Sequence, residues 1–412
     1  MAEELSALRR VRRERDLFVA NELIGDVLLA QGDPVAALES YQASLAIAAG
    51  HLAADPDDAS WWRSLSDAHD TIGDVLMDQG SLAGALESYQ ASLIATEMLL
   101  NTEPDNADWQ RDFAISHIKI GDVQMASQDF TAALQSYTAS LAIVEHLVLL
   151  QPANTEWLRD RSISHERIGD VLSAQGGHTM ALASYRECAG IREHLNDIAP
   201  GNSDWQHDLS TTYEKTGETL LALDDLRGAL DSYRLALDIR GRLVDGNPAN
   251  LDWLRDLSIS HDGIGTVMED RGNPAAALEH YKAALAIAER LARHDPGDSI
   301  RQRELYISLE NVSRVQEAMG EARAALLTSG AMLDIARRIA AGDAEDAGKL
   351  RDLAAAFRRV ATLTLLLGDR AGASAALSKG RAVVIRLLQE SPGDLGLIGD
   401  LAWFDSQIAT IT

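Results

Sequence analysis

The sequence has few aromatic residues, a single cysteine and no long apolar run. Aromatic residues make up 5% of the 412 positions, which is few for a protein built from packed β-sheets. Cys188 is the one cysteine, so no disulfide can form within the chain, and the N-terminal segment lacks the apolar run of a secretion signal. No stretch approaches the roughly 18 apolar residues of a membrane span. These absences predict an all-α, cytoplasmic protein.

Basic residues are also scarce in most of the chain. Lysine and arginine number 37 against 63 aspartate and glutamate, which gives a net charge of −26. Residues 1–300 hold 23 basic and 49 acidic residues, whereas residues 301–412 hold 14 of each. Affinity for phosphate requires basic side chains, so the acidic field disfavours nucleic acid and anionic membranes. We expect a protein or peptide partner, with a basic segment, and neither nucleic acid nor membrane.

The same pattern returns every 48 residues without an insertion or deletion. Repeats of 20 to 50 residues are typical of solenoids, in which each unit packs on its neighbours. The marker positions are Trp61, Trp109, Trp157, Trp205 and Trp253; Gly25, Gly73, Gly121, Gly169, Gly217 and Gly265; and Tyr41, Tyr89, Tyr137, Tyr185, Tyr233 and Tyr281. Because solenoids present extended surfaces, this periodicity favours binding over catalysis.

Each repeat contains two predicted helices of about 20 residues. In the second repeat, apolar positions from residue 61 to residue 76 recur at spacings of three and four, which is one face of an α-helix. Asn106, Asn154 and Asn250 stand where a helix needs an N-cap, and Gly80 follows the expected end of a helix. Asp33-Pro34 then begins the second helix with proline in its first turn. One repeat is therefore a helical hairpin.

The spacing inside the repeat resembles that of the tetratricopeptide repeat. Gly73 is followed by Ala85 after twelve residues, by Tyr89 after four more and by Ser92 after three more. The resemblance is strong from residue 23 to about 285, although the unit is fourteen residues longer than the family's 34 and is similar to the lengthened units of bacterial multi-repeat proteins. It implies a right-handed α-solenoid of tandem helical hairpins.

The repeats change in character along the chain. Residues 1–300 form six regular repeats, the first with an extended N-terminal capping helix. Residues 301–396 form two degenerate repeats, in which Ser313 and Ala361 replace the glycine, and Ser329 and Leu377 replace the tyrosine. Residues 397–412 are predicted to be a C-terminal capping half repeat, because terminal units of solenoids differ from internal ones.

No catalytic or metal-binding motif is indicated. His69, His117, His165 and His261 recur in register, but equivalent residues of successive repeats lie about 10 Å apart or more. Zinc needs ligand nitrogens at about 2.0–2.1 Å, so one ion cannot reach two of these histidines. We expect them, and the tryptophan series, to fill packing positions. No phosphate-binding loop, nucleophile elbow or Cys/His cluster is present, so we expect no enzyme activity, no cofactor and no metal.

Two rows of acidic residues are the candidate binding site. The resemblance implies that the first helix of each repeat turns two positions toward the concave groove, the residue after the glycine and the residue three before it. The acidic residues at these positions are Asp26, Asp74, Asp122, Asp170 and Glu218, with Glu22, Asp70, Glu166, Glu214 and Asp262. Like charges four apart on a helix cost a few tenths of a kcal/mol. Either a basic partner selects them, or Lys119, Arg167 and Lys215 on adjoining helices neutralise them.

The sequence therefore predicts a protein-interaction scaffold that binds a basic or amphipathic partner segment in an acidic concave groove. The resemblance also implies an alternative, a sensor or adaptor subunit of a bacterial signalling or defence system that acts with a separate effector enzyme. Paired carboxylates in a groove could in principle do acid–base chemistry, but nothing in the sequence supplies a nucleophile or a cofactor loop.

Overall fold

A computed structural model describes residues 2–342 and 346–411, with side chains from residue 10 onward. Over these residues the chain forms seventeen α-helices and no strand, which confirms the predicted all-α class. The helices are α1 (Ala2–Ala30), α2 (Pro34–Ala54), α3 (Ala59–Asp78), α4 (Leu82–Thr102), α5 (Ala107–Ala126), α6 (Phe130–Leu150), α7 (Thr155–Ala174), α8 (His178–Ile198), α9 (Ser203–Ala222), α10 (Leu226–Gly246), α11 (Leu251–Asp270), α12 (Pro274–His294), α13 (Ser299–Ala318), α14 (Ala322–Gly342), α15 (Ala347–Leu366), α16 (Arg370–Glu390) and α17 (Leu395–Ile411).

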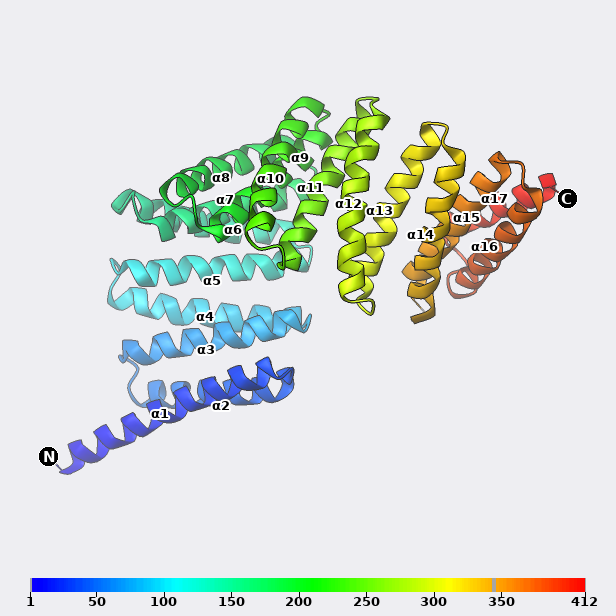
Figure 1. Ribbon diagram of the computed structural model, residues 1–412. Coiled ribbons are helices and arrows are strands. Elements are labelled where there is room, and N and C mark those ends of the chain that lie inside the picture. The colour runs from blue at the N-terminus through cyan, green and yellow to red at the C-terminus, as the bar shows by residue number, and fades with distance from the viewer. Residues whose placement is uncertain (1, 343–345, 412) are drawn as a thin grey trace. The chain divides into compact units, whose positions relative to one another are not determined.

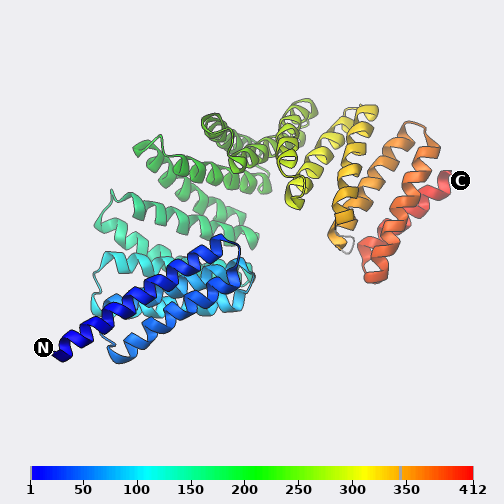
Figure 2. The ribbon, with the colours of Figure 1, turned by 60° about the horizontal axis from the view of Figure 1, so that its bottom comes forward.

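The chain divides into two compact units, residues 1–201 with α1–α8 and residues 202–412 with α9–α17. Inside each unit, the first helix of a repeat packs against the second helix of the same repeat, and that second helix packs against the first helix of the next repeat. Figure 1 shows this for α3, α4 and α5, which lie side by side. Each unit is thus a stack of helical hairpins, which is the architecture of an α-solenoid. The N-terminal part of α1 extends past its partner α2 (Figures 1 and 2).

The turn residues act as the sequence predicts. The side chains of Asn106, Asn154, Asn202 and Asn250 each accept hydrogen bonds from two backbone N–H groups in the first turn of the following helix. These bonds satisfy donors that a helix start otherwise leaves unpaired. Gly80 has a φ of +72°, so it adopts the left-handed conformation that ends a helix.

Each hairpin is closed by contact between its glycine and its tyrosine. A Cβ atom built on Gly121 would lie 2.7 Å from Cδ1 and 2.9 Å from Cζ of Tyr137, so only glycine fits beneath the ring. The other pairs with this close contact are Gly25 with Tyr41, Gly73 with Tyr89, Gly169 with Tyr185 and Gly265 with Tyr281. In the seventh repeat Ser313 and Ser329 occupy these two positions, and their hydroxyl oxygens lie 2.6 Å apart. A hydrogen bond there replaces the ring contact.

Helix α6 is more apolar than the sequence analysis allowed for. It is the one helix of the described chain that could cross a membrane by length and composition alone. In the structure it is the second helix of a hairpin, with Ala133, Tyr137, Val144, Leu147 and Val148 buried. Burial within the stack accounts for these five apolar residues, whereas Leu149 and Leu150 at the end of the helix are exposed. The last helix, α17, packs against α16 and buries Leu397 and Phe404.

Candidate partner-binding site

The aspartates that follow the repeat glycine hold the hairpins together. Each accepts a hydrogen bond from the tyrosine hydroxyl fifteen residues later, on the second helix of its own hairpin. The four bonds of the first unit are Tyr41 to Asp26 (2.8 Å), Tyr89 to Asp74 (2.7 Å), Tyr137 to Asp122 (2.7 Å) and Tyr185 to Asp170 (2.8 Å). We call these four carboxylates the aspartate row. Each of them has a structural contact in addition to any binding role.

Two cations of the next repeat also reach the aspartate row. Lys119 Nζ lies 2.8 Å from Asp74 Oδ1, and Arg167 Nε lies 3.0 Å from Asp122 Oδ1. Of the neutralising residues named from the sequence, Lys119 and Arg167 therefore form the expected ion pairs. The side chain of Asp74 is nevertheless 55% exposed, and Asp26 is also exposed. The carboxylates of Asp26 and Asp74 are therefore open to solvent. Ion pairs between exposed side chains contribute little to stability.

The second acidic row, three residues before the glycine, lies deeper. In the first unit Glu22 accepts a hydrogen bond from Ser44, and Glu166 pairs with Arg192 at 2.5 Å. Glu166 is only 8% exposed, so it faces the interior of its hairpin rather than open solvent. Burial raises the pKa of Glu22 against the opposing effect of the Ser44 hydroxyl. These carboxylates mainly join the two helices of a hairpin.

Two buried arginines were missed from the sequence. Arg192 and Arg240 are 4% and 1% exposed and pair with Glu166 and Glu214. Arg240 also donates to Ser210 Oγ (3.2 Å), to Ser260 Oγ (2.8 Å) and to the backbone oxygen of Asp256 (2.8 Å). The repeat register could have revealed them, because a charged residue replaces a small or apolar one at this position. The same position holds Ala48, Thr96, Val144 and Ala288 in other repeats.

Asp262 is the acidic residue of the second row with the largest pKa shift. Burial raises its pKa from 3.8 to about 7, against the opposing effect of the Asn311 side chain. Its Oδ1 atom is buried and has no hydrogen-bond partner. It borders a cleft of about 270 Å³ that is otherwise lined by residues including Ile259 and Ile307. This carboxylate is costly to ionise where it stands.

We therefore expect Asp262→Asn to stabilise the protein at alkaline pH. Because the folded-state pKa is raised, protonated Asp262 favours the fold below pH 4, and that stability is lost as the pH rises through about 7. The difference between the ordinary pKa of 3.8 and the folded-state pKa of about 7 corresponds to at most about 4 kcal/mol in the free energy of unfolding. Denaturant titrations at pH 4 and pH 8 should show a gain for Asp262→Asn at pH 8 only. The exposed Asp231→Asn change on α10 is the control, and an equal gain from both variants would contradict the assignment.

A second cleft lies on the face of the aspartate row in the first unit. It has a volume of about 230 Å³ and is lined by residues of α5, α6 and α7 that include Ile115, Ile118 and Ile163. Ile115, Ile118 and Asp122 are spaced by three and four residues, so they share one face of α5. Asp160 also lines the cleft and pairs with Arg111 at 2.5 Å. Acidic and apolar groups thus lie together.

Arginines on the first helices link successive repeats. Arg111 on α5 pairs with Asp160 on α7, as described above. Arg255 on α11 pairs with Glu304 on α13, with 2.5 Å between Arg255 Nε and Glu304 Oε1. His207 and Asp256 occupy the corresponding positions on α9 and α11, at 2.7 Å. The sequence analysis did not foresee these bridges, since each joins residues 49 positions apart.

The recurring histidines and tryptophans lie in packing positions. His69, His117, His165 and His261 are all half-buried, and burial lowers the pKa of each, that of His261 to about 4. Trp61 is fully buried and Trp157 is 5% exposed. The remaining members of the tryptophan series, Trp109, Trp205 and Trp253, are half-buried. These positions agree with the packing role that the sequence analysis predicted for both series.

No protein-family model matches the chain, and no curated protein matches it. Solved structures match it by fold. A signal transduction ATPase with numerous domains from Pyrococcus horikoshii, which carries a tetratricopeptide repeat sensor, matches over 93% of this chain and 50% of its own length, with 14% identity and a TM-score of 0.59. The apo form of RapI matches over 96% and 97% of the two chains, with 10% identity and a TM-score of 0.56. The nuclear import adaptor Nro1 of S. pombe matches over 73% and 100%, with 13% identity and a TM-score of 0.51.

These matches agree with the repeated helical hairpins of the structure. The chain has the tetratricopeptide-repeat fold, as the spacing of glycine, alanine and tyrosine predicted. Identities of 10% to 14% carry the fold and no further property of these proteins.

Proposed function

We propose that the first unit is a protein-interaction scaffold whose aspartate row binds a basic, amphipathic segment of a partner protein. The observation that supports this most is the joint presence of solvent-facing carboxylates and an apolar cleft on one face. Asp26 and Asp74 are exposed, and the cleft beside Ile115 and Ile118 lies on the helix face that carries Asp122. A lysine or arginine of the partner pairs with the carboxylates, and an apolar side chain enters the cleft.

The charge of the first unit supports the same partner chemistry. Residues 1–201 hold 13 basic and 31 acidic residues. An acidic field of this kind accelerates encounter with a basic segment and disfavours acidic partners. The tyrosine hydroxyls hold the carboxylates in place before binding, so little side-chain freedom is lost when the partner arrives.

We expect removal of the charge of the aspartate row to weaken binding of a basic helical peptide. The variant changes Asp26, Asp74, Asp122 and Asp170 to asparagine. Asparagine keeps an oxygen that can accept the tyrosine hydroxyl, so the hairpin contact survives while the charge is lost. The probe is a synthetic peptide with lysines on one face and leucines on the other, followed by fluorescence anisotropy. Four lost pairs of about 0.4 kcal/mol each correspond to about 15-fold weaker binding.

The control removes the same number of charges from the second helices. Glu39, Glu87, Glu97 and Glu145 are exposed on α2, α4 and α6, and their change to glutamine alters the net charge equally. We expect this control to lose at most about twofold in affinity, and we expect added salt to shrink the difference between the two variants. Equal losses in both variants would mean that the peptide responds to net charge alone, and the proposed site would be wrong.

The structural comparison favours a second candidate function. The match to the signal transduction ATPase covers half of that protein, and its printed description includes a tetratricopeptide repeat sensor. On this basis the chain is a sensor or adaptor that acts with a separate effector enzyme. This candidate function requires a complex with an effector enzyme. Co-purification of the chain with the products of neighbouring genes tests it, and we expect an enzyme to be recovered with the chain. Recovery of the chain alone, in a preparation where those products are expressed, would argue against it.

A further inference from the structure

The first repeat has a histidine where the other repeats have an apolar core residue. His51 lies in the last turn of α2 and is 8% exposed. The equivalent positions hold Leu99, Leu147, Leu195, Leu243, Leu291, Ile339 and Leu387. Burying a polar ring costs free energy unless it gains partners, so packing alone would favour leucine at residue 51 as well.

Both ring nitrogens of His51 face carboxylates. Nδ1 lies 3.2 Å from Glu14 Oε2 on α1, and Nε2 lies 3.2 Å from Asp58 Oδ2 at the start of α3. A neutral imidazole carries one N–H, so it can satisfy only one of these carboxylates. The other nitrogen then turns its lone pair toward an oxygen, unless a second proton or a metal cation lies between them.

Glu14 departs from the repeat together with His51. The equivalent positions of Glu14 hold no acidic residue: they are Trp62, Gln110, Leu158, Gln206, Leu254, Gln302 and Leu350. A carboxylate that accepts the Nδ1–H of a histidine fixes the tautomer and leaves Nε2 free to bind a metal ion. Glu14 and His51 thus form the pair that commonly orients a metal-binding imidazole.

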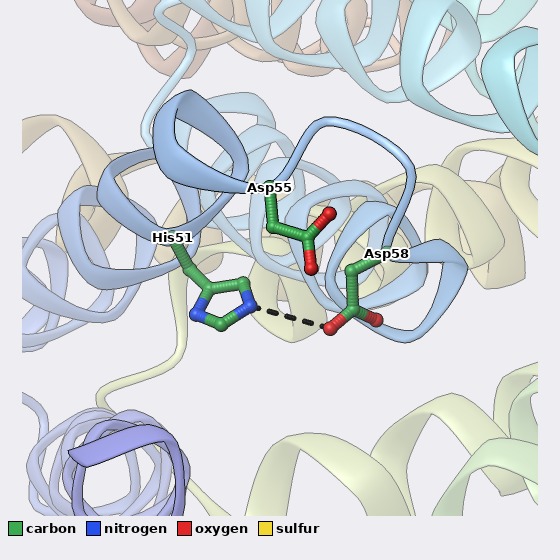
Figure 3. A group of neighbouring side chains, drawn as sticks. All are labelled: His51, Asp55 and Asp58. Atoms are coloured by element: carbon green, nitrogen blue, oxygen red, sulfur yellow. Dashed lines mark hydrogen bonds and ion pairs between the residues drawn. The ribbon is translucent and has the colours of Figure 1, made fainter. Parts of the chain in front are cut away.

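Two aspartates complete a ligand set around Nε2. Among the residues that the structure describes, His51, Asp55 and Asp58 offer ligand atoms that all lie within 4.8 Å of one another. Figure 3 shows the three side chains around one space, with an oxygen of Asp58 directed at the ring and the Asp55 carboxylate beside them. Ligand atoms about 2.0–2.1 Å from a tetrahedral zinc ion lie about 3.3–3.4 Å apart. The 3.2 Å between His51 Nε2 and Asp58 Oδ2 already fits one such edge.

The rest of the local packing holds the ligands in place. The Trp61 ring stacks on His51 with centroids 4.7 Å apart, and the Arg15 guanidinium lies 3.8 Å from the centre of that tryptophan ring. Asp58 uses Oδ1 to accept from the backbone and hydroxyl of Ser60, which leaves Oδ2 directed at His51. The imidazole and one carboxylate are therefore preorganised.

We propose that His51 Nε2, Asp58 Oδ2 and an oxygen of Asp55 bind a zinc ion, with solvent in the fourth position and Glu14 as the orienting carboxylate. A nitrogen ligand with few oxygens favours zinc over calcium or magnesium, which prefer sites made of oxygen. The ion joins α2, the turn after it and the start of α3, and Glu14 links α1 to the same centre. It stabilises the first hairpin of the stack.

Zinc binding to the full chain, measured by calorimetry in metal-free buffer, tests this site. We expect one zinc ion to bind the wild type with a rise in melting temperature, and we expect His51→Leu to remove both effects while folding normally, because leucine is the residue of the other repeats. Asp55→Asn should weaken zinc binding at least tenfold. Glu14→Gln should weaken it by about 10- to 100-fold, the usual effect of losing such a partner.

The sixth repeat supplies the control. Asp295 occupies the position of Asp55 in a repeat that has Leu291 in place of histidine, so Asp295→Asn should leave zinc binding unchanged. Equal zinc affinity in the wild type and His51→Leu would overturn the proposal. A wild type that binds no zinc would overturn it as well. Calcium or magnesium binding that survives His51→Leu would likewise contradict a site built on the imidazole.

Discussion

Truncating Arg240 to alanine is expected to lower the free energy of unfolding by about 3–5 kcal/mol, the usual result of breaking a buried ion pair. Arg240 is 1% exposed and has four hydrogen-bonding partners, namely Glu214, Ser210, Ser260 and the backbone of Asp256. Its loss would leave the Glu214 carboxylate half-buried without its cation. The guanidinium also joins α9, α10 and α11, so one side chain connects two successive repeats.

Denaturant titration followed by circular dichroism measures this effect. Arg242→Ala is a matched control on the same helix, because Arg242 is 56% exposed and pairs with Asp238 at the surface. It should change stability by less than about 1 kcal/mol. Replacing Arg240 and Glu214 together by leucine should cost less than Arg240→Ala alone, since no charge is then left unpaired. Similar losses for Arg240→Ala and Arg242→Ala would show that the buried pair does not hold these helices together.

Gly121→Leu is expected to cost at least about 3 kcal/mol, the upper end of ordinary core overpacking. Even the first carbon of the new side chain would lie 2.7 Å from Tyr137 Cδ1. The ring cannot yield freely, because its hydroxyl donates to Asp122, which also pairs with Arg167 of the next repeat. The clash therefore disturbs the hairpin of α5 and α6 and the contact with α7.

Gly190 provides the control for this substitution. It lies within α8, and a Cβ atom added there would meet no atom within 4 Å. Gly190→Ala should raise the melting temperature slightly, because alanine is favoured over glycine in a helix by about 1 kcal/mol. If Gly121→Leu melts at the wild-type temperature, the glycine is not the point of close approach between the paired helices.

The hairpins could be predicted from the sequence because their signals are local. Asn106 and Gly80 act within one turn of the chain, and the glycine and tyrosine of a hairpin recur at a fixed spacing that the resemblance explains. The drift of the seventh repeat was also visible, although the hydrogen bond between Ser313 and Ser329 was not. That bond depends on two helices being side by side, which only the structure supplies.

The properties of the acidic rows could not be predicted to the same extent. Both rows were predicted to face the groove, yet Asp74 of the aspartate row is exposed and Glu166 of the second row is buried. The partner of Glu166 could not be foreseen either, because Arg192 lies 26 residues beyond it and enters the hairpin from the second helix. The double role of Asp122, as acceptor for Tyr137 and partner of Arg167, also needs helices from two repeats. The replacement of leucine by His51 was visible in the register, but its contact with Glu14 was not.

The structural contacts of the aspartate row affect the protonation of its members. Burial raises the pKa of Tyr137, with the Asp122 carboxylate acting in the same direction, so the phenol remains protonated and keeps donating. Burial also raises the pKa of Asp122, against the effect of Arg167. A basic partner bound as proposed would compete with Lys119 and Arg167 for these carboxylates, and we expect this competition to make binding sensitive to salt.

Cross-linking of a photoreactive basic peptide to the full chain, read by mass spectrometry, tests the central claim most directly. If the aspartate row and its cleft form the binding site, cross-links should fall on the first helices of the first unit, near Asp74, Ile118 and Asp122. The variant with asparagine at Asp26, Asp74, Asp122 and Asp170 should lose them at physiological salt. Cross-links that fall instead on the exposed sides of α2, α4 and α6, or that persist in the variant, would contradict the account.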